Sequence, residues 1–332
     1  MNTIEKEVLS FLKESKLINP SEELLVTLKP FNTDGGVTNK YYLIEIENKS
    51  KYLYRCPGKQ WNGSFSRLTE EFNLKIVYEM GIQTGVLYFN SISGKQILTY
   101  KPKQKSLDKK IGKSEIVSIA KIFNKLHGFK KLMQNDYNPV EVIWSSYKRL
   151  PNKENHVLKI EKNLIERILF DWLCSFRKIV PCHNEPYLSN FIKNRKNFRF
   201  VDWEYSANNF KEWDLAFFSL KAMLNPFEEE FFIMSYYSET DENINHNIVL
   251  FNLFKPIVAM VLLIWSASRL PYLKEEAYQQ QIKKLNHSKE QYHHSLIRLF
   301  SYISPLKTHL SPKKMRVSEE GDTKLVCLSP KP

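Results

Sequence analysis

Five polar side chains that could carry out chemistry lie among short apolar runs near the middle of the chain. The stretch "HNEPYLSN" contributes His183, Glu185 and Asn190, and "VDWEY" contributes Asp202 and Glu204. Amide and carboxylate oxygens are hard ligands, and Mg²⁺ usually takes one or two protein carboxylates together with phosphate oxygens. A further carboxylate is then free to orient an attacking hydroxyl group. These residue types favour a magnesium-dependent phosphoryl transfer.

The spacing of the two acidic residues supports this interpretation. Asp202 and Glu204 are two positions apart in a predicted strand, so both side chains should point to the same face. From spacing alone, a polar β-hairpin with a capped turn explains the same residues, and that alternative stays open.

The elements that must position these residues fall into two patterns. The N-terminal part alternates strands with a helix: Ile4, Val8 and Phe11 recur at helical spacing, and Leu68 to Met80 mark one face of a second helix that ends at Gly81. From about residue 114 the pattern becomes helical, with a hairpin through "NRKN" between residues 179 and 203. The predicted strands cover 23–31, 40–47, 51–58 and 96–101, and the predicted helices cover 116–126, 157–169 and 213 to about 301.

Composition limits the class of protein. Hydrophobic residues make up 42% of the 332 residues and charged residues 26%, which is typical of a soluble globular protein. The net charge of +13 suits an anionic ligand such as a nucleotide, a nucleic acid or an anionic membrane surface. The lysines are spread along the chain, and no nucleic-acid-binding signature is present, so we expect no nucleic-acid partner.

Cysteine spacing and hydropathy bear on the compartment. The four cysteines form no CxxC pair, so neither a zinc site nor a disulfide framework is indicated, and a cytoplasmic location is predicted. The N-terminal "MNTIEKEVLSFLKESK" lacks the apolar run of a signal peptide. The most apolar segment, 256–265, is too short to span a bilayer and predicts a buried helix.

Several motifs together resemble a known family. An H-x-D-x-x-x-x-N loop followed by a hairpin that ends in Asp is the catalytic core of the protein-kinase-like fold, and "CHN…N…VDWEYS…WDLAFF" (182–218) resembles it. This form is most similar to choline kinases, particularly the bacterial branch of the aminoglycoside phosphotransferase superfamily. "DGGVTNKYYLI" (34–44), "YRCPGK" (54–59) and "RLTEEFN" (67–73) resemble the family's G-G-x-T/S-N, R-x-P-G-K and R-x-x-E-x-x-N motifs.

The resemblance covers roughly residues 30 to 300 and implies a two-lobed α+β fold. It implies a nucleotide-binding lobe over residues 1–101 and a catalytic and acceptor-binding lobe, mostly helical, over 102–304, joined by a hinge near 100–106. Residues 305–332 lack periodicity and predict a mobile basic tail.

The resemblance also implies a nucleotide site for ATP. Gly35 and Gly36 would form a tight turn whose backbone N–H groups approach phosphates, and Thr38 and Asn39 would follow on the next strand. Arg55 would lie over the α- and β-phosphates, where its planar fork suits bidentate contact.

A helix residue would pair with Arg55, and the motif gives Glu70 this role. Glu71 is one position away and stays an alternative. Asn190 and Asp202 would hold Mg²⁺. His183 would be structural, and Asp214 would lie buried under the loop and accept its hydrogen bonds, or serve as a helix N-cap.

The acceptor implied by the resemblance is a small amino alcohol, with choline first. A quaternary ammonium has no N–H group, so aromatic faces and a nearby carboxylate hold it. Leu262 stands where the family commonly has the first Trp of a W-x-x-W pattern, so the aromatic cage would be one ring short. The candidate substrate-binding residues are Trp203, Glu204, Tyr205, Trp265, Tyr272 and Tyr278.

One position departs from the family in the catalytic loop. Glu185 stands where the family has Asp, so the carboxylate is kept but lies one methylene further from the backbone. The resemblance therefore implies an ATP- and Mg²⁺-dependent choline kinase that is slow. Ethanolamine or an aminoglycoside as acceptor, or a catalytically impaired protein that binds nucleotide or choline, are the alternatives.

Overall fold

The structure is a computed structural model of the chain. It describes residues 3–19, 26–31, 39–47, 51–57, 66–100, 105–107, 110–150, 179–194, 197–238, 244–270 and 275–307. The chain divides into two compact units, Met1–Tyr137 with Ile179–Ile244, and Asn138–Lys178 with Asn245–Pro332. The first unit carries the predicted catalytic loop together with the N-terminal sheet, so the predicted boundary at residue 101 falls inside it.

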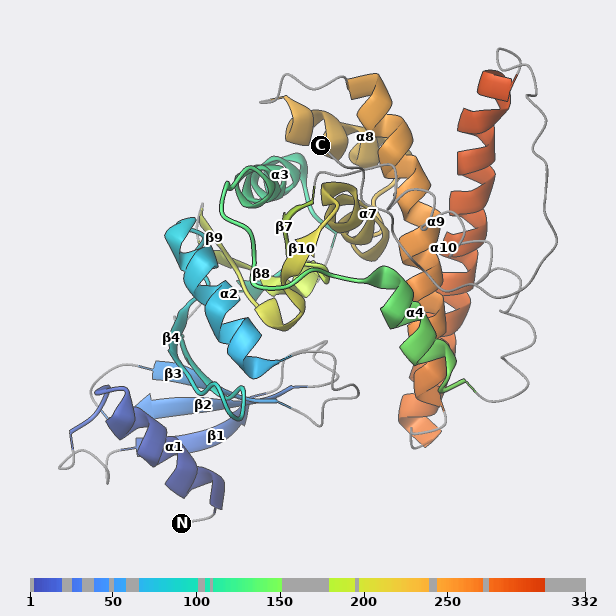
Figure 1. Cartoon of the computed structure of the whole chain (residues 1–332). Helices are drawn as coiled ribbons and strands as arrows, with labels where there is room; N and C mark the ends of the chain where they lie inside the picture. Colours follow the sequence, from blue (N-terminus) through green and yellow to red (C-terminus); the bar gives the residue numbers. More distant parts are fainter. Residues whose placement is uncertain are drawn as a thin grey trace, which may run out of the picture. The chain divides into compact units, whose positions relative to one another are not determined.

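The N-terminal part is an antiparallel sheet covered by one helix (Figure 1). Side chains of α1 (Thr3–Glu14) such as Phe11 and Leu12 form a core with Ile44, Tyr54 and Ile97 of the sheet. The predicted strands are confirmed, and a strand before residue 96 was missed. The strand order is β1 (Val26–Phe31), β2 (Lys40–Ile46), β3 (Lys51–Cys56), β5 (Gln96–Thr99), β4 (Val86–Phe89).

The helix that follows β3, α2 (Arg67–Glu79), is confirmed, and half of its predicted apolar face is buried, with Ile76 1% and Met80 4% exposed. Leu68 is 67% exposed and Phe72 43% exposed, whereas Glu70 and Asn73 are buried. The reason is that the polar pair faces the protein interior and finds partners there. The hydrophobic stripe therefore identifies the buried side in the second half of this helix but not in its first half.

Four short elements surround the catalytic loop. Strand β7 (Val180–Cys182) pairs antiparallel with β10 (Ala207–Asn209), and the predicted hairpin is confirmed as β8 (Phe191–Asn194) and β9 (Asn197–Phe200). A short strand β6 (Lys105–Ser106) extends this second sheet beyond β8.

The helices of the first unit enclose an aromatic core. The helix α3 (Lys113–His127) packs against α8 (Pro226–Tyr237), and α7 (Lys211–Lys221) lies next to both β7 and α3. The Phe123 ring of α3 contacts rings from β8, β9, α7 and α8 at centroid distances near 6 Å: Phe191, Phe200, Phe218 and Phe232. This core fixes the base of the catalytic loop.

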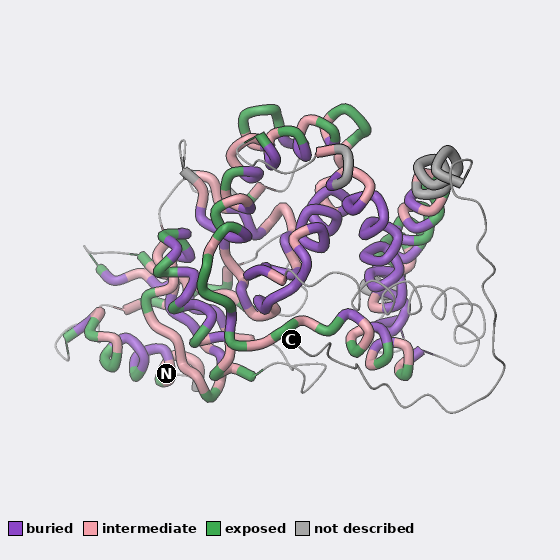
Figure 2. The backbone as a smooth tube through the Cα atoms, turned by 45° about the horizontal axis from the view of Figure 1, so that its top comes forward, coloured by how far each residue is buried: buried purple, intermediate pink, exposed green. Residues whose placement is uncertain are grey.

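The second unit contains three described helices: α4 (Pro139–Tyr147), α9 (Ile244–Arg269) and α10 (Glu275–Lys307). The part Asn247–Arg269 of α9 is long and apolar enough to cross a membrane by composition, but 83% of its apolar window is buried inside the protein. Figure 2 shows this burial along α9. The predicted buried helix over 256–265 is thus confirmed. The predicted helix over 157–169 lies outside the described residues, and α10 continues three residues past the predicted start of the tail.

Candidate active site

The loop after β7 is held from below by a buried carboxylate. The Asp214 side chain, from the first turn of α7, accepts the backbone N–H of His183 at 2.8 Å and that of Asn184 at 2.7 Å. It is 0% exposed, so these bonds to a charged acceptor form without competition from water. Asp214 therefore has the position under the loop that the sequence predicted. It is not an N-cap, because α7 begins after Phe210.

The His183 side chain is buried and neutral, and it packs under the loop. Its ring stacks on Phe200 with centroids 4.1 Å apart, and its Nε2–H donates to the Val201 carbonyl at 3.0 Å. Burial lowers the pKa of His183 to about 4, with Asp214 opposing the shift. Its Nδ1 has no hydrogen-bond partner among the described residues, as expected of the neutral tautomer. A structural role fits every contact.

The next residue, Asn184, was missed by the sequence analysis although it connects three elements. Its backbone is left-handed, with φ +68°. Its Nδ2 donates to the Tyr205 carbonyl at 2.8 Å, and its Oδ1 accepts from Asn209 at 2.8 Å. Its carbonyl accepts the Trp213 indole N–H at 3.0 Å. Only the left-handed tendency of Asn gave a local signal for this position.

The residues predicted to act and to hold metal lie close together along the backbone. Asn190 ends the short 3-10 helix η2 (Leu188–Asn190), and its Nδ2 donates to the Glu185 carbonyl at 3.1 Å. Its own carbonyl accepts the Val201 N–H at 3.0 Å, which brings Asn190 beside the residue that precedes Asp202. With the amide nitrogen bonded to the loop, the Asn190 side-chain oxygen is oriented away from it.

Asp202 lies in a left-handed conformation, φ +69°, and begins the 3-10 helix η3 (Trp203–Tyr205). The predicted strand through Asp202 and Glu204 is therefore wrong, because β9 ends at Phe200. Burial raises the pKa of Asp202 to about 7, while Arg55 opposes the shift. A cation would relieve that burial cost, and a carboxylate with a neighbouring amide oxygen is a donor set suited to Mg²⁺.

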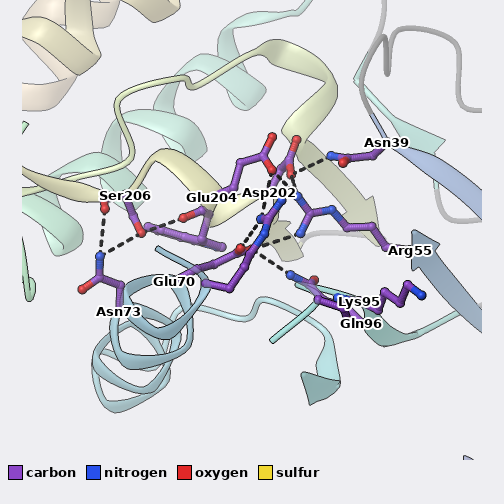
Figure 3. A network of polar contacts seen from close by, with 12 residues as sticks. Asn39, Arg55, Glu70, Asn73, Lys95, Gln96, Asp202, Glu204 and Ser206 are labelled. Carbon is purple, nitrogen blue, oxygen red and sulfur yellow. Dashed lines mark hydrogen bonds and ion pairs between the residues drawn. The ribbon is translucent and has the colours of Figure 1, made fainter. Parts of the chain in front are cut away.

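Arg55 lies among three carboxylates (Figure 3). Its Nη1 is 3.0 Å from Glu70, and its Nη2 is 2.7 Å from Glu204 and 3.1 Å from Asp202. The Arg55 side chain is 2% exposed. The predicted partner Glu70 is confirmed over its neighbour Glu71, which pairs with Lys75 on the solvent side.

Further polar residues extend this cluster. Arg67, one helical turn before Glu70, forms ion pairs with Glu70 and, at 3.3 Å, with Glu204. Gln96 of β5 donates to Glu70 at 2.9 Å. The Asn39 amide oxygen, turned toward Arg55, accepts from Nη2 and Nε at 3.1 Å each. Protein groups therefore face all three nitrogen atoms of the Arg55 fork.

Asn73 ties α2 to the segment after η3 and was quoted in a motif without a role. Its Nδ2 donates to the Ser206 carbonyl at 2.8 Å and to Asn135 at 3.1 Å. Its Oδ1 accepts the Gln134 N–H at 2.8 Å. The R-x-x-E-x-x-N spacing thus places three polar residues on the inward face of α2.

Two of the residues predicted to bind the acceptor have other contacts. Trp203 is 1% exposed, its indole N–H donates to Phe200 at 2.7 Å and its ring contacts His183. A ring covered in this way has no face for a cation, so the structure assigns Trp203 to packing. Glu204 faces Arg55 and Arg67, which already neutralise its charge.

Tyr205 remains compatible with the acceptor role. It is half-buried, and burial together with the charge of Glu185 raises its pKa above the ordinary value. Tyr137, which the sequence analysis missed, has a raised pKa for the same two reasons.

The remaining candidates belong to the second unit or to positions that are not described. Trp265 is half-buried, and the Arg269 guanidinium lies 4.8 Å from its ring centroid. Leu262 is buried in α9, and Tyr278 lies in α10. The predicted residues Gly35, Gly36, Thr38 and Tyr272 lie outside the described residues.

A histidine, a cysteine and a carboxylate also meet under the loop. The ligand atoms of His127, Cys182 and Asp214 lie within 4.8 Å of one another. The His127 ring bonds Tyr236 at 2.9 Å and Asp214 at 3.3 Å, and burial raises the pKa of the Cys182 thiol. The Asp214 oxygens already accept the loop N–H groups, so this group is better explained by hydrogen bonding than by a metal.

Comparisons with known proteins bear on the family and the fold of the chain. A family model described as choline/ethanolamine kinase matches residues 32–295. The protein LicA of Haemophilus influenzae is 23% identical over 219 residues, which is 64% of this chain and 64% of LicA, so the match spans less than two thirds of that relative.

Solved structures show the fold. The choline kinase LicA from Streptococcus pneumoniae superposes with a TM-score of 0.67 at 22% identity, covering 85% of this chain and 99% of that one. A spectinomycin phosphotransferase in complex with ADP and spectinomycin superposes with a TM-score of 0.53 at 12% identity, covering 80% and 88%. The chain therefore has the predicted α+β protein-kinase-like fold, with a β-rich N-terminal part and a mostly helical C-terminal part.

Proposed function

Because the chain belongs to the choline/ethanolamine kinase family, we propose that it transfers the γ-phosphoryl group of Mg·ATP to the hydroxyl of a small amino alcohol, choline first. The observation that carries this proposal is a pair of hydrogen bonds. Asn190 Nδ2 donates to the Glu185 carbonyl, and the Asn190 carbonyl accepts the N–H of Val201, the residue before Asp202. This pair holds a carboxylate, an amide oxygen and a second carboxylate in one small region of the first unit.

Each group has a separate task in this proposal. Asn190 and Asp202 would hold Mg²⁺, which supplies charge neutralisation at the phosphates. The Glu185 carboxylate would accept or orient the proton of the acceptor hydroxyl. Arg55 would contact the phosphates, which requires it to leave part of its carboxylate shell. Positioning of these groups supplies most of the rate, because phosphoryl transfer asks for little covalent chemistry from the protein.

Choline is placed first among the acceptors for two reasons. LicA from S. pneumoniae is described as a choline kinase. In this chain, the Tyr205 carbonyl accepts a hydrogen bond from Asn184, the residue before Glu185, and a quaternary ammonium binds aromatic rings such as that of tyrosine. Ethanolamine would need hydrogen-bond acceptors for its primary ammonium and is the second acceptor to test.

The proposal is tested by phosphoryl transfer to choline, ethanolamine and an aminoglycoside, with wild-type protein and two variants of Glu185. We expect turnover of choline above the others. Glu185→Gln should lower kcat by about 10²–10⁴-fold, because the proton acceptor is lost. Glu185→Asp should hold or raise kcat, because a one-methylene displacement of about 1 Å can itself cost about 10²-fold. Equal rates for wild type and the Gln variant would show that Glu185 is not the base.

A second function is a nucleotide or choline binder without turnover. The specific observation in its favour is Glu185 itself, which is followed by Pro186. Proline restricts the preceding residue to extended backbone conformations, so the loop has little freedom to seat the longer side chain. Binding of Mg·ATP without transfer to any acceptor, in both wild type and Glu185→Asp, would favour this function.

A further inference from the structure

The cluster around Arg55 contains more negative than positive side chains. Arg55 and Arg67 face three carboxylates, those of Glu70, Asp202 and Glu204. Arg55 and Glu70 are almost completely buried, and the side chains of Arg67 and Glu204 are 10% and 11% exposed. The Glu70 and Glu204 carboxylates therefore need a cation, because water solvates them poorly, whereas the Asp202 side chain is 26% exposed.

The contacts of Arg55 leave at most one donor for a phosphate, the second N–H of Nη1. A guanidinium has five N–H donors, two on each Nη and one on Nε. Nη2 already meets Glu204 and Asp202, Nη1 meets Glu70, and Asn39 faces Nε and Nη2. A phosphate can therefore contact this fork through two N–H groups only if a second donor, such as one on Nη2, gives up its carboxylate partner.

The two carboxylates that contact Nη2 differ in their alternative cationic partners. Asp202 has a second role, at the metal, under the proposed function. Glu204 has a second cation, because its Oε2 lies 3.3 Å from Arg67 Nη1 while it lies 2.7 Å from Arg55. Arg67 can keep Glu204 neutralised with a small shortening of that contact.

We propose that Arg67 is a positioning residue of the nucleotide site, which retains the Glu204 carboxylate when Arg55 turns to the phosphates. This inference rests on the proposed function of Arg55. It also moves Glu204 from the acceptor side, where the sequence placed it, to the nucleotide side. Arg67 acts through Glu204 and Glu70 and does not itself contact the substrate.

Gly94 leaves the space that the Arg67 side chain occupies. Gly94, in the turn between β4 and β5, has φ +70°, and a Cβ there would lie 2.7 Å from Arg67 Cζ. The Arg67 side chain therefore passes directly over the Gly94 backbone. Its position is fixed both by ion pairs and by the space that glycine leaves.

The test is calorimetry of Mg·ATP binding to the full chain for wild type, Arg67→Gln, Arg67→Lys and Lys75→Gln. Lys75 lies on the same helix, pairs with Glu71 at 2.8 Å and is 69% exposed, so its variant removes one charge outside the cluster. Loss of a charge-assisted contact predicts about tenfold weaker binding for Arg67→Gln. Arg67→Lys should recover most of this loss, and Lys75→Gln should match wild type.

Two further readouts separate positioning from a merely structural role. Arg67→Gln should raise the KM for ATP and leave the KM for the acceptor unchanged. Adding Glu204→Gln to Arg67→Gln should restore part of the ATP affinity, because the carboxylate that needs a second cation is gone. Thermal unfolding of each variant confirms that it is folded at the assay temperature, and Arg67→Lys serves if the Gln variant does not fold.

The outcomes are distinguishable. If wild type binds Mg·ATP and Arg67→Gln binds it equally well, the positioning role is overturned and the proposed function stands. If Glu204→Gln raises the acceptor KM and not that of ATP, Glu204 belongs to the acceptor side and the inference is wrong. If wild type does not bind Mg·ATP, the proposed function fails, and this inference fails with it.

Discussion

The catalytic loop and the Arg55 cluster are both polar and buried, yet they are held in different ways. Asp214 holds the loop through backbone N–H groups at 2.7 and 2.8 Å, which cannot move without moving the chain. The Arg55 cluster is held by side chains, and Glu204 is shared between two arginines. The backbone bonds hold the catalytic loop in one position, whereas the side chains of the Arg55 cluster can exchange partners without a change of fold.

This difference suits the tasks that the proposed function gives to the two regions. A proton acceptor and metal ligands must be held in place before the substrates arrive, because small displacements are costly. A phosphate-binding cation such as Arg55 must instead be paired with carboxylates in the absence of nucleotide and exchange them for phosphate oxygens when the nucleotide binds. Variants of the loop should therefore cost mainly stability, and variants of the cluster should cost mainly nucleotide affinity.

The largest expected effect comes from a variant of Asp214, the residue that anchors the base of the loop. Asp214→Asn replaces one of the two acceptor oxygens by an NH₂ group, so one loop N–H faces a donor. The buried mismatch should lower the free energy of unfolding by about 4 kcal/mol. Urea unfolding measures it. Asp136→Asn is the matched control, because Asp136 is exposed and accepts one bond from Asn208. Equal losses in both variants would contradict the anchoring role.

The second prediction uses pH to sharpen the contrast. Burial lowers the pKa of His183 from 6.5 to about 4, so the unfolded chain binds a proton more readily than the folded one between these values. The contribution of neutral His183 to the free energy of unfolding is complete above about pH 6.5. It falls by about 3 kcal/mol as the pH decreases toward 4. Urea unfolding at pH 7 and pH 4.5 measures this loss.

His183→Gln should flatten that pH dependence, because the titrating group is removed. His287→Gln is the control, since the side chain of His287 is 46% exposed. An unchanged slope in the His183 variant would mean that another group governs the acid sensitivity.

Sequence patterns predicted the chain's elements better than the inward face of α2 or the contacts of Glu204. Periodicity identified the helix over 67–79 but placed Leu68 and Phe72 inside, because a stripe of apolar residues says nothing of polar residues that find buried partners. The family motif placed Glu70 on Arg55 correctly. For Glu204, the position beside an aromatic pair suggested an ammonium, whereas its contacts are with Arg55 and Arg67, 149 and 137 residues away.

Asn184 illustrates the same limit within the loop. Its bonds reach Tyr205, Asn209 and Trp213, each more than twenty positions along the chain. Spacing within "HNEPYLSN" carries no information about such partners. The residues that act in the proposed chemistry could be found from their types. Of the residues that hold them, the family motifs gave Asp214 and Glu70 but not Asn184 or Asn73.

The smallest expected loss of stability, and the one most specific to the Arg55 cluster, concerns Gly94. Alanine there adds a Cβ 2.7 Å from Arg67 Cζ at a backbone φ of +70°. Strain and displacement of Arg67 together should cost about 2 kcal/mol of stability. Because Arg67 moves, Gly94→Ala should also weaken Mg·ATP binding, as Arg67→Gln does.

Gly81→Ala is the matched control for that variant. Gly81 follows α2 with φ +67°, so alanine there carries the same backbone strain, but its new Cβ meets only the flexible end of Lys125 at 3.1 Å. We expect Gly81→Ala to lower the unfolding temperature and leave Mg·ATP affinity at the wild-type value. If Gly94→Ala costs as much in an Arg67→Gln background as alone, the clash with Arg67 is not the cause. A smaller cost there would tie the turn between β4 and β5 to the cluster, since the two residues would then be acting as one unit.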